Sequence, residues 1–422
     1  MTRARCYALA LLVGVCCMGP AQAFAQYGPA PRPGYGPGGP DCPIESSDPM
    51  TAAPWYGTGD DGVEPSINRF GPQARINSWF LRAEYLHWNI DSPGNVMLGA
   101  PVQDVSDPTQ PFEIFAVNNT TPIAFGAVPT TKDIRLNDTS GIQVTGGVEL
   151  IDGGRIEISA FMLGRKQSGI TLPLGAQVDT ALLPGGSGIA GAGPFVPLVA
   201  VTSTLTNGQI GDNLLLYNVS YKAVMTSQLW GGEINYLADQ DATEIWQFLP
   251  LGGFRYLNLT ERFTQYGLFD DQFVTSPPIN TQIESLAINN LWGGQIGFRG
   301  QFVSKYLEFG ATPKVLFLGD SAVSSVYAAR LRSSADPTVS STDMTTKFTF
   351  GGDLNGFVNI NLSPSFSIRG GYTILWINQV TRPHRDIVYD DHGPAAPAGI
   401  GQQFVFHDIF IHGFNFGCEF RF

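Results

Sequence analysis

The strongest constraint on the fold is the alternation in residues 410–422. Counted back from Phe422, every second residue is apolar or only weakly polar and most of these residues are aromatic, whereas the residues between them are polar or small apart from Ile411. Successive side chains of a β-strand point to opposite faces, so this stretch predicts a strand with one aromatic wall and one mainly polar wall. Such a strand is typical of an outer-membrane barrel, where every other residue contacts hydrocarbon. Within it we expect the assembly signal to consist of Phe414, Phe416, Phe420 and Phe422.

The composition also suits a barrel better than a soluble globule. Of the 422 residues, 43% are hydrophobic and 14% are charged, whereas about a quarter is charged in soluble domains. The 50 glycines and 30 prolines favour many turns over long helices. Beyond the N-terminus, no run of about 20 uncharged apolar residues predicts a transmembrane helix, and alternating strands escape that test. The net charge of −12 argues against nucleic acid as a partner.

The sequence predicts three successive segments. Residues 1–25 have the order of a secretory signal, with two arginines, an apolar run and small residues at a cleavage site. Residues 26–75 are rich in Gly and Pro, so we expect a disordered leader on the periplasmic side. Residues 76–422 are then expected to form one outer-membrane β-barrel.

An internal repeat sets the number of strands. Its mark is a Gly-Gly pair followed at once or one residue later by an acid or an amide, at 146–147, 231–232, 293–294 and 351–352. Each copy leads through a short break into a second alternating run, which predicts four hairpins. With an opening strand at 78–88 and the closing strand at 410–422, the count is ten antiparallel strands in an all-β fold. The glycine pairs are expected to permit the bending that strong curvature needs.

Long stretches between the hairpins predict external loops. They are rich in Gly, Pro, Ser and Thr and occupy residues 91–140, 165–213, 260–284, 319–346 and 381–402. Long outer loops alternating with short periplasmic turns are typical of outer-membrane barrels. Two segments, 114–125 and 214–223, are apolar enough to extend strands above the membrane or to add a pair, which leaves twelve strands as an alternative.

Alternation also assigns the charged residues to the lumen. When apolar residues set the outward face of each strand, seven acids and six bases share the opposite face. A charge on the lipid face costs about 2–4 kcal/mol at the midplane, so we predict that these residues form a lumen charge network. Its members are Arg82, Glu84, Glu149, Glu157, Glu233, Arg255, Arg299, Glu308, Lys314, Asp353, Arg369, Glu419 and Arg421. Ten strands lie near the narrow end of the range, which favours a narrow or charge-plugged lumen, with a porin-like passive channel for small solutes as the alternative.

The sequence presents no catalytic, metal-binding or cofactor-binding pattern, so we predict a non-enzymatic protein without a cofactor. Residues 384–392 hold the densest group of metal-ligand types, in a stretch whose composition fits a solvated acidic loop. No Gly-x-Ser-x-Gly or other nucleophile setting accompanies His412, which argues against a membrane-embedded hydrolase. Cys42 and Cys418 are too few for a disulfide scaffold, and a bond between them stays an alternative.

Five stretches carry a resemblance to a known family. They are residues 79–88, 154–157, 229–235 and 251–262, together with the terminal Phe422. They resemble the Bbp-seven-type family of planctomycete outer-membrane β-barrel proteins, and together they span the predicted barrel. The Phe-Arg-Tyr-Leu-Asn-Leu run at 254–259 is the most specific, whereas a terminal Phe is shared by many unrelated barrels. The resemblance implies a single outer-membrane barrel and transfers no functional residues, because that family has no established activity. The tight turn at 152–154 departs from the longer turn expected there and leaves the register of the first hairpin open.

These features predict a structural, loop-presenting protein in the outer membrane of a Gram-negative-type envelope. The expected partners are outer-membrane lipid, the barrel assembly machinery, and small solutes or extracellular ligands that the loops meet. Because a spanning sheet cannot leave an edge in lipid, the closing strand must pair with the opening strand. We therefore expect Glu419 and Arg421 to meet Arg82 and Glu84 at this seam.

Overall fold

The computed structural model describes residues 76–100, 114–118, 123–150, 154–179, 195–206, 209–238, 245–270, 277–390 and 400–422. The signal and the leader predicted for residues 1–75 lie outside these ranges. No helix in the described ranges is both long and apolar enough to cross a membrane.

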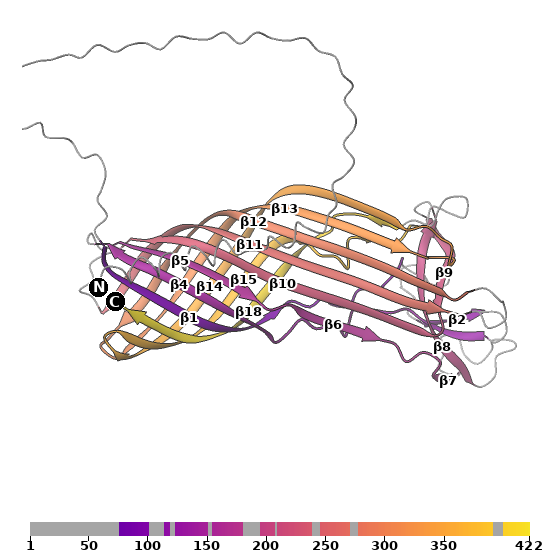
Figure 1. The fold of residues 1–422 in the computed structure, drawn as a ribbon, viewed down its shortest axis with the longest axis horizontal. Helices are drawn as coiled ribbons and strands as arrows, with labels where there is room; N and C mark the ends of the chain where they lie inside the picture. Colours follow the sequence, from indigo (N-terminus) through magenta and orange to yellow (C-terminus); the bar gives the residue numbers. More distant parts are fainter. Residues whose placement is uncertain are drawn as a thin grey trace, which may run out of the picture. The chain divides into compact units, whose positions relative to one another are not determined.

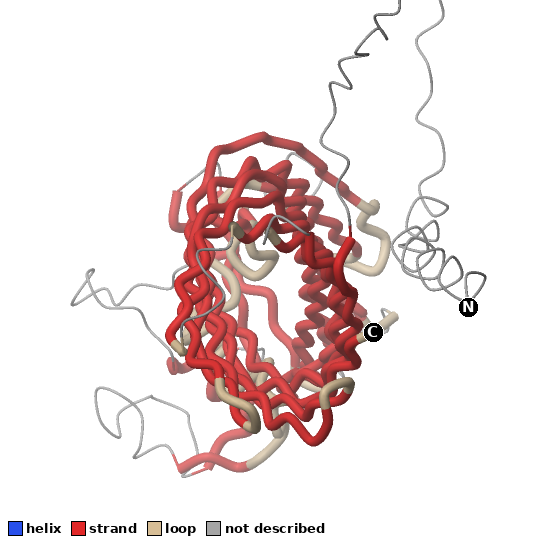
Figure 2. The backbone as a smooth tube through the Cα atoms, turned by 90° about the vertical axis from the view of Figure 1, so that its left-hand side faces the viewer, coloured by secondary structure: helices blue, strands red, loops and turns tan. Residues whose placement is uncertain are grey.

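Ten antiparallel strands form a closed barrel, which confirms the predicted architecture (Figure 1). Figure 2 shows the strands as a closed ring. The barrel strands are β1 (Ile76–Ile90), β4 (Thr139–Leu150), β5 (Arg155–Leu163), β10 (Ser220–Leu237), β11 (Trp246–Phe269), β12 (Ile279–Val303), β13 (Leu307–Ala329), β14 (Val339–Ser363), β15 (Phe366–Thr381) and β18 (Phe406–Arg421). The closing strand β18 pairs with β1 from Phe80–Arg421 to Ile90–Ile411, so no barrel edge is left open. A short extra strand, β6 (Lys166–Thr171), continues the line of β5 along β10. We call the end of the barrel that carries the short turns the lower end, and the opposite end the upper end.

Two rings of outward-facing aromatic residues mark the part of the barrel that spans the membrane. The lower ring includes Trp79, Trp246, Phe302, Phe309 and Phe422, and the upper ring includes Trp230, Tyr256, Trp292, Phe317, Phe350, Trp376 and Phe410. On β11 the rings are ten residues apart, from Trp246 to Tyr256. At about 3.3 Å per residue and a strand tilt of about 40°, this spacing is about 25 Å along the membrane normal, the height of a lipid-facing band.

Strands β10 to β14 continue well beyond the upper ring (Figure 1). On β11 the strand ends 13 residues after Tyr256, and β12 begins 13 residues before Trp292. The external loops predicted at 260–284 and 319–346 are therefore wrong for most of their length, since only their tips connect strands. Their Ser- and Thr-rich composition suits a loop, but it equally suits a strand whose outward face meets water.

The apolar and polar faces of β11 exchange sides at the upper ring. Below the ring, Phe254 faces outward and Arg255 faces inward. Above it, Leu259 and Phe263 face inward and are fully buried, while Arg262 is on the outer face. The barrel therefore has a charged interior at membrane depth and an apolar interior above the membrane.

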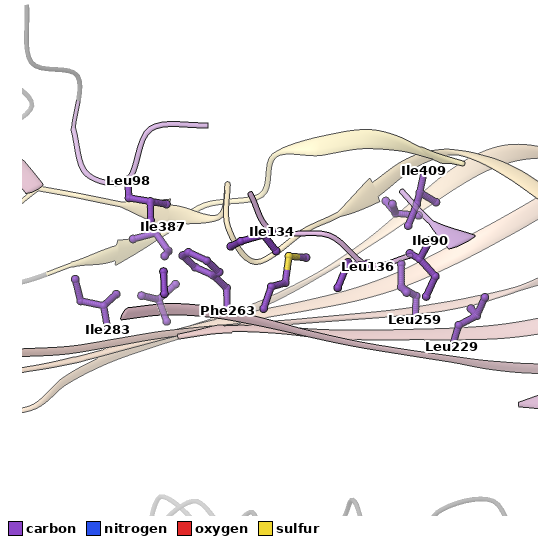
Figure 3. Packing of buried hydrophobic residues seen from close by; sticks show 14 of the residues in the cluster. Ile90, Leu98, Ile134, Leu136, Leu229, Leu259, Phe263, Ile283, Ile387 and Ile409 are labelled. Atoms are coloured by element: carbon purple, nitrogen blue, oxygen red, sulfur yellow. The ribbon is translucent and has the colours of Figure 1, made fainter. Parts of the chain in front are cut away.

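Parts of two long connections fill the apolar interior (Figure 3). Leu98 and Ile134 from the first connection and Ile387 from the last belong to the same buried cluster as wall residues of β10, β11 and β12. The stretches 91–140 and 381–402 are thus not wholly external, which corrects the prediction, because their apolar residues pack against the apolar inner wall. We call their inward parts, which Figure 2 shows inside the ring, the upper plug.

A separate five-stranded sheet lies at the upper end (Figure 1). It contains β2 (Ile114–Asn118), β3 (Ile123–Ala127), β7 (Gln177–Asp179), β8 (Phe195–Thr206) and β9 (Gln209–Tyr217), and a short pair, β16 (Ile387–Val388) and β17 (Gly401–Gln402), forms a sheet of its own. Segment 114–125 falls in β2 and β3, and segment 214–223 is divided between β9 and β10. Neither segment adds a pair to the barrel, so the twelve-strand alternative is wrong.

Candidate functional site: the charged lumen

All thirteen residues of the predicted lumen charge network lie on the inward face of the barrel. Ten of them are buried, and Glu149, Glu233 and Arg421 are half-buried. Each belongs to at least one ion pair with another lumen charge. The structure therefore brings together residues from all ten barrel strands in three charge clusters and one separate pair.

The first cluster bridges the lumen between β5 and β12. Arg299 donates two hydrogen bonds to Glu157, at 2.8 and 2.7 Å, although β10 and β11 lie between their strands in the ring. Arg155 extends the cluster, with its guanidinium 2.6 Å from Glu149 and 3.7 Å from Glu157. Sequence reasoning missed Arg155 because it stands at the junction of turn and strand, although it shares the inward face with Glu157. With it, the network has seven acids and seven bases and is formally neutral.

The second cluster is a closed ring of alternating charges. Arg255 lies 3.3 Å from Glu233 and 2.6 Å from Asp353, and Lys314 lies 2.9 Å from Glu233 and 3.0 Å from Asp353. The four residues come from β10, β11, β13 and β14. Gln295 adds a hydrogen bond to Glu233 at 3.0 Å. Each charge thus has two partners of opposite sign, which offsets the cost of burying it.

The third cluster lies at the β1–β18 seam. Arg82 and Glu419 are direct partners in the register and their side chains are 2.7 Å apart. Arg421 lies 2.8 Å from Glu419 and 3.3 Å from Glu308 of β13. The charges at the seam therefore join the closing strand to β1 on one side and reach across the lumen on the other.

Two inward phenylalanines fill the space between the charges. Glu84 does not join the seam cluster but pairs with Arg369 of β15 at 3.3 Å, and that guanidinium lies 4.0 Å above the ring of Phe357. On the other side, the guanidinium of Arg82 lies 5.4 Å from the ring of Phe80. The lower lumen is therefore packed with ion pairs and with aromatic rings that contact them.

A further buried ion pair, outside the lumen charge network, ties the upper plug to the wall. Arg382 donates to both carboxylate oxygens of Glu261 at 2.8 Å and to the carbonyl of Asp91 at 3.0 Å. The side chains of Arg382 and Glu261 are 4% and 0% exposed. Sequence reasoning missed this pair because both residues fall in stretches predicted as loops. The signal that would have found it is the inward face of β11, on which Glu261 stands between Leu259 and Phe263.

The predicted solvated loop at 384–392 is buried in its described part, which corrects that interpretation. Asp386 accepts hydrogen bonds from the hydroxyls of Ser324 and Thr381, at 2.9 and 2.7 Å, and from the backbone amide of Val405 at 3.2 Å. Burial raises the pKa of Asp386 to about 6, although these hydrogen bonds act in the opposite direction. Burial, and then the neighbouring arginines, hold the pKa of His384 well below its usual value. In the described residues, no cluster of three metal-ligating side chains is present.

The sequence of the barrel matches a family model from the first strand to the last residue. The model described as "Putative beta barrel porin-7 (BBP7)" matches residues 80–422. The chain belongs to the beta barrel porin-7 family. No curated protein sequence matches this porin-7 chain significantly.

Solved outer-membrane structures are similar to the porin-7 chain at low identity. The outer membrane protease OmpT from Escherichia coli is 7% identical, with 84% of this chain and 99% of that chain covered and a TM-score of 0.43. The outer-membrane OmpT of Vibrio cholerae is 8% identical, with coverages of 82% and 97% and a TM-score of 0.13. An anion-selective porin from Comamonas acidovorans is 11% identical, with coverages of 83% and 100% and a TM-score of 0.14. At these scores the likenesses carry no argument, and the fold rests on the strand pairings above.

The outward face of the porin-7 closing strand carries the predicted assembly signal. Phe414, Phe416, Phe420 and Phe422 are all on the lipid-facing side and between 43% and 65% exposed. The ring of Phe422 stacks on Trp79 of β1 with centroids 3.9 Å apart. On the same face, His412 hydrogen-bonds through Nδ1 to the hydroxyl of Tyr372 at 2.6 Å, and Cys418 is a free thiol.

Proposed function

We propose that this porin-7 family member is a non-enzymatic outer-membrane barrel whose lumen is closed to free diffusion. Its role is to hold the extended wall and the five-stranded sheet above the membrane, where they meet extracellular ligands. Outer-membrane lipid and the barrel assembly machinery are its other expected partners. The observation that supports the proposal most directly is the pairing of every predicted lumen charge with another lumen charge.

Two barriers in series support the closed lumen. The lower barrier is the neutral charge network with Phe80 and Phe357 between its members. The upper barrier is the apolar plug, which the buried pair of Arg382 and Glu261 ties to the wall. A general diffusion pore needs a water-filled lumen, which is characteristic of barrels of sixteen or more strands.

A passive channel for small solutes is the second candidate. The porin description of its family and the charged interior at membrane depth favour it. In this case the upper plug would have to leave the barrel, and solutes would pass along the lower charge clusters. The two functions differ in whether the wild-type protein conducts.

Conductance across planar bilayers separates the two candidates. We expect the wild-type protein to insert without discrete conductance. Because the barriers are in series, Glu233→Ala with Lys314→Ala should also stay closed, and only its combination with Arg382→Ala should conduct. The matched control replaces Arg262 and Glu284, an ion pair on the outer face, by Ala.

Heat-dependent gel mobility confirms that each variant is a folded barrel. Discrete wild-type conductance that changes when Arg299 or Glu233 is neutralised would reject the closed lumen and support the channel. The absence of catalysis is checked by incubating the purified protein with lipid, whose composition should stay unchanged.

A further inference from the structure

A small polar notch opens on the outer side of the barrel at the level of the upper aromatic ring. It has a volume of about 140 Å³, and its lining residues are Asn89, Ile90, Asp91, Ser92, Asn137, Phe410 and His412. Phe410 belongs to the upper ring, so the notch lies where hydrocarbon gives way to headgroups. The lumen charge network includes none of these residues.

Hydrogen bonds hold the three chain segments of the notch together. The amide of Asp91 donates to the carbonyl of Phe410 at 3.0 Å, which fixes the end of β1 against β18. The amide of Leu136 donates to the hydroxyl of Ser92 at 3.3 Å, and the amide of Ile90 donates to the carbonyl of Leu136 at 3.3 Å. The walls of the notch are therefore set by the fold.

A run of aromatic residues leads from the notch down the lipid-facing wall. The rings of Phe410 and His412 are 5.3 Å apart, and those of Tyr372 and Phe414 are 4.9 Å apart. The hydroxyl of Tyr372 is bonded to the imidazole of His412. Polar side chains on a lipid-facing surface are costly and mark functional positions, so this pair requires an explanation.

We propose that the notch binds the primary ammonium headgroup of an outer-leaflet lipid, whose acyl chain lies along the aromatic run. The carboxylate of Asp91 supplies the negative charge, and the amide oxygen of Asn137 supplies a further acceptor. The amide oxygen of Asn89 accepts the backbone amide of Asp138 at 2.8 Å and keeps a second lone pair for the ammonium. A primary ammonium offers three donors and no acceptor, which matches this set. A quaternary ammonium has no N–H to donate, and an anionic headgroup without an amine would be repelled by Asp91.

The position of the notch favours a membrane lipid over a soluble amine. A lipid in the outer leaflet is held at the depth of Phe410 and reaches Asp91 without leaving the membrane. A charge-assisted hydrogen bond is typically worth enough that its loss weakens binding roughly tenfold or more.

The test is lipid binding to the folded full-length barrel in detergent, followed by native mass spectrometry and by thermal stability. Phosphatidylethanolamine should be retained and should raise the melting temperature. Phosphatidylcholine, phosphatidylglycerol and soluble phosphoethanolamine should each bind at least about tenfold more weakly. The first two have no N–H group to donate to Asp91, and the third has no acyl chain to contact the aromatic run.

Two variants and one control make the test specific. Asp91→Asn should weaken phosphatidylethanolamine binding about tenfold. Asn137→Phe should fill the notch and abolish this binding. Asp133→Asn changes the same charge at an exposed position of the same connection and should bind as the wild type does. Asn137→Phe remains informative if Asp91→Asn disturbs the neighbouring Arg382. Equal binding of phosphatidylcholine, undiminished binding in both variants, or equal binding of soluble phosphoethanolamine would overturn the proposal.

Discussion

Breaking the buried pair of Glu157 and Arg299 should destabilise the barrel more when the acid is removed than when the base is removed. The pair is bidentate and both side chains are less than a tenth exposed. In Glu157→Gln, the guanidinium of Arg299 keeps the hydroxyl of Thr312 at 3.3 Å and loses its carboxylate. In Arg299→Met, the carboxylate of Glu157 still has Arg155 at 3.7 Å. Removal of the acid therefore leaves the less compensated charge.

The expected magnitudes follow from this difference. Removal of one member of a buried pair typically costs about 3–5 kcal/mol, because the other charge stays buried without compensation. We expect Glu157→Gln to be near the top of this range and Arg299→Met near the bottom. The double variant buries neither charge, so it should cost no more than about 1 kcal/mol, because neutral replacement of a whole buried pair is often neutral or stabilising. The coupling energy between the two sites should then exceed about 2 kcal/mol.

Equilibrium urea unfolding in lipid vesicles, followed by tryptophan fluorescence, measures these free energies. The matched control is the outer pair of Arg262 and Glu284, which lie 2.7 Å apart with side chains 44% and 26% exposed. Glu284→Gln and Arg262→Met should each change the free energy of unfolding by about 0.5 kcal/mol or less. Additive costs at Glu157 and Arg299 would refute the claim that the two buried charges compensate each other. A larger cost for Arg299→Met than for Glu157→Gln would refute the claim that Arg299 is the less compensated of the two.

Three further predictions concern the repeat, the plug and the closing strand. A side chain at Gly293 would clash with a backbone carbonyl of the neighbouring strand, whereas at Gly294 the nearest atom would be a carbonyl oxygen 4.0 Å away, an ordinary contact. Gly293→Ala should therefore cost about 1–3 kcal/mol and Gly294→Ala about 0.5 kcal/mol or less in urea unfolding. The pKa of Asp386 is raised to about 6, so the stability that its protonated form contributes is fully present below about pH 4 and is lost as pH rises through 6. The loss should be about 3 kcal/mol. It should be absent in Asp386→Asn when melting of the two proteins is compared from pH 4 to 8. Deletion of Phe422 removes the stack on Trp79 and two backbone hydrogen bonds, so the folded fraction in a gel mobility assay should fall, and an unchanged fraction would count against the assembly signal.

The membrane-spanning part of the fold was readable from the sequence because lipid imposes a strict rule on each strand. Ile296 and Arg299 are an odd number of positions apart, so their side chains lie on opposite faces of the strand. Hydrocarbon tolerates only the isoleucine, which fixes the face of the arginine as the inner one. The same rule assigned all thirteen lumen charges to the interior. It did not assign their partners, since pairing across the lumen depends on how strands far apart in the ring face each other.

The part above the membrane was not readable in the same way. The stretch that holds Glu261 is polar in composition, and this composition fits both a loop and a strand with one wet face. The inward course of Ile134 and Ile387 depends on an apolar surface that exists only when the wall extends beyond the membrane. Without the extended wall there is no reason to bury these residues. The extended strands and the inward course of the connections were therefore missed for the same reason.

The reversal of faces at the upper ring explains why a charged layer and an apolar plug occur in one barrel. Within the membrane, lipid covers the apolar face of β11, and the interior is free to hold charges that neutralise one another. Above Tyr256 water covers the outer face, so Leu259 and Phe263 turn their side chains inward, and an apolar inner wall in water must be covered. The chain covers it with its own connections, because β1, β15 and β18 end near the ring and leave the opposite side of the wall to them. An extended wall of this kind therefore requires a plug for its own stability, and the closed lumen that we propose would follow from the same requirement.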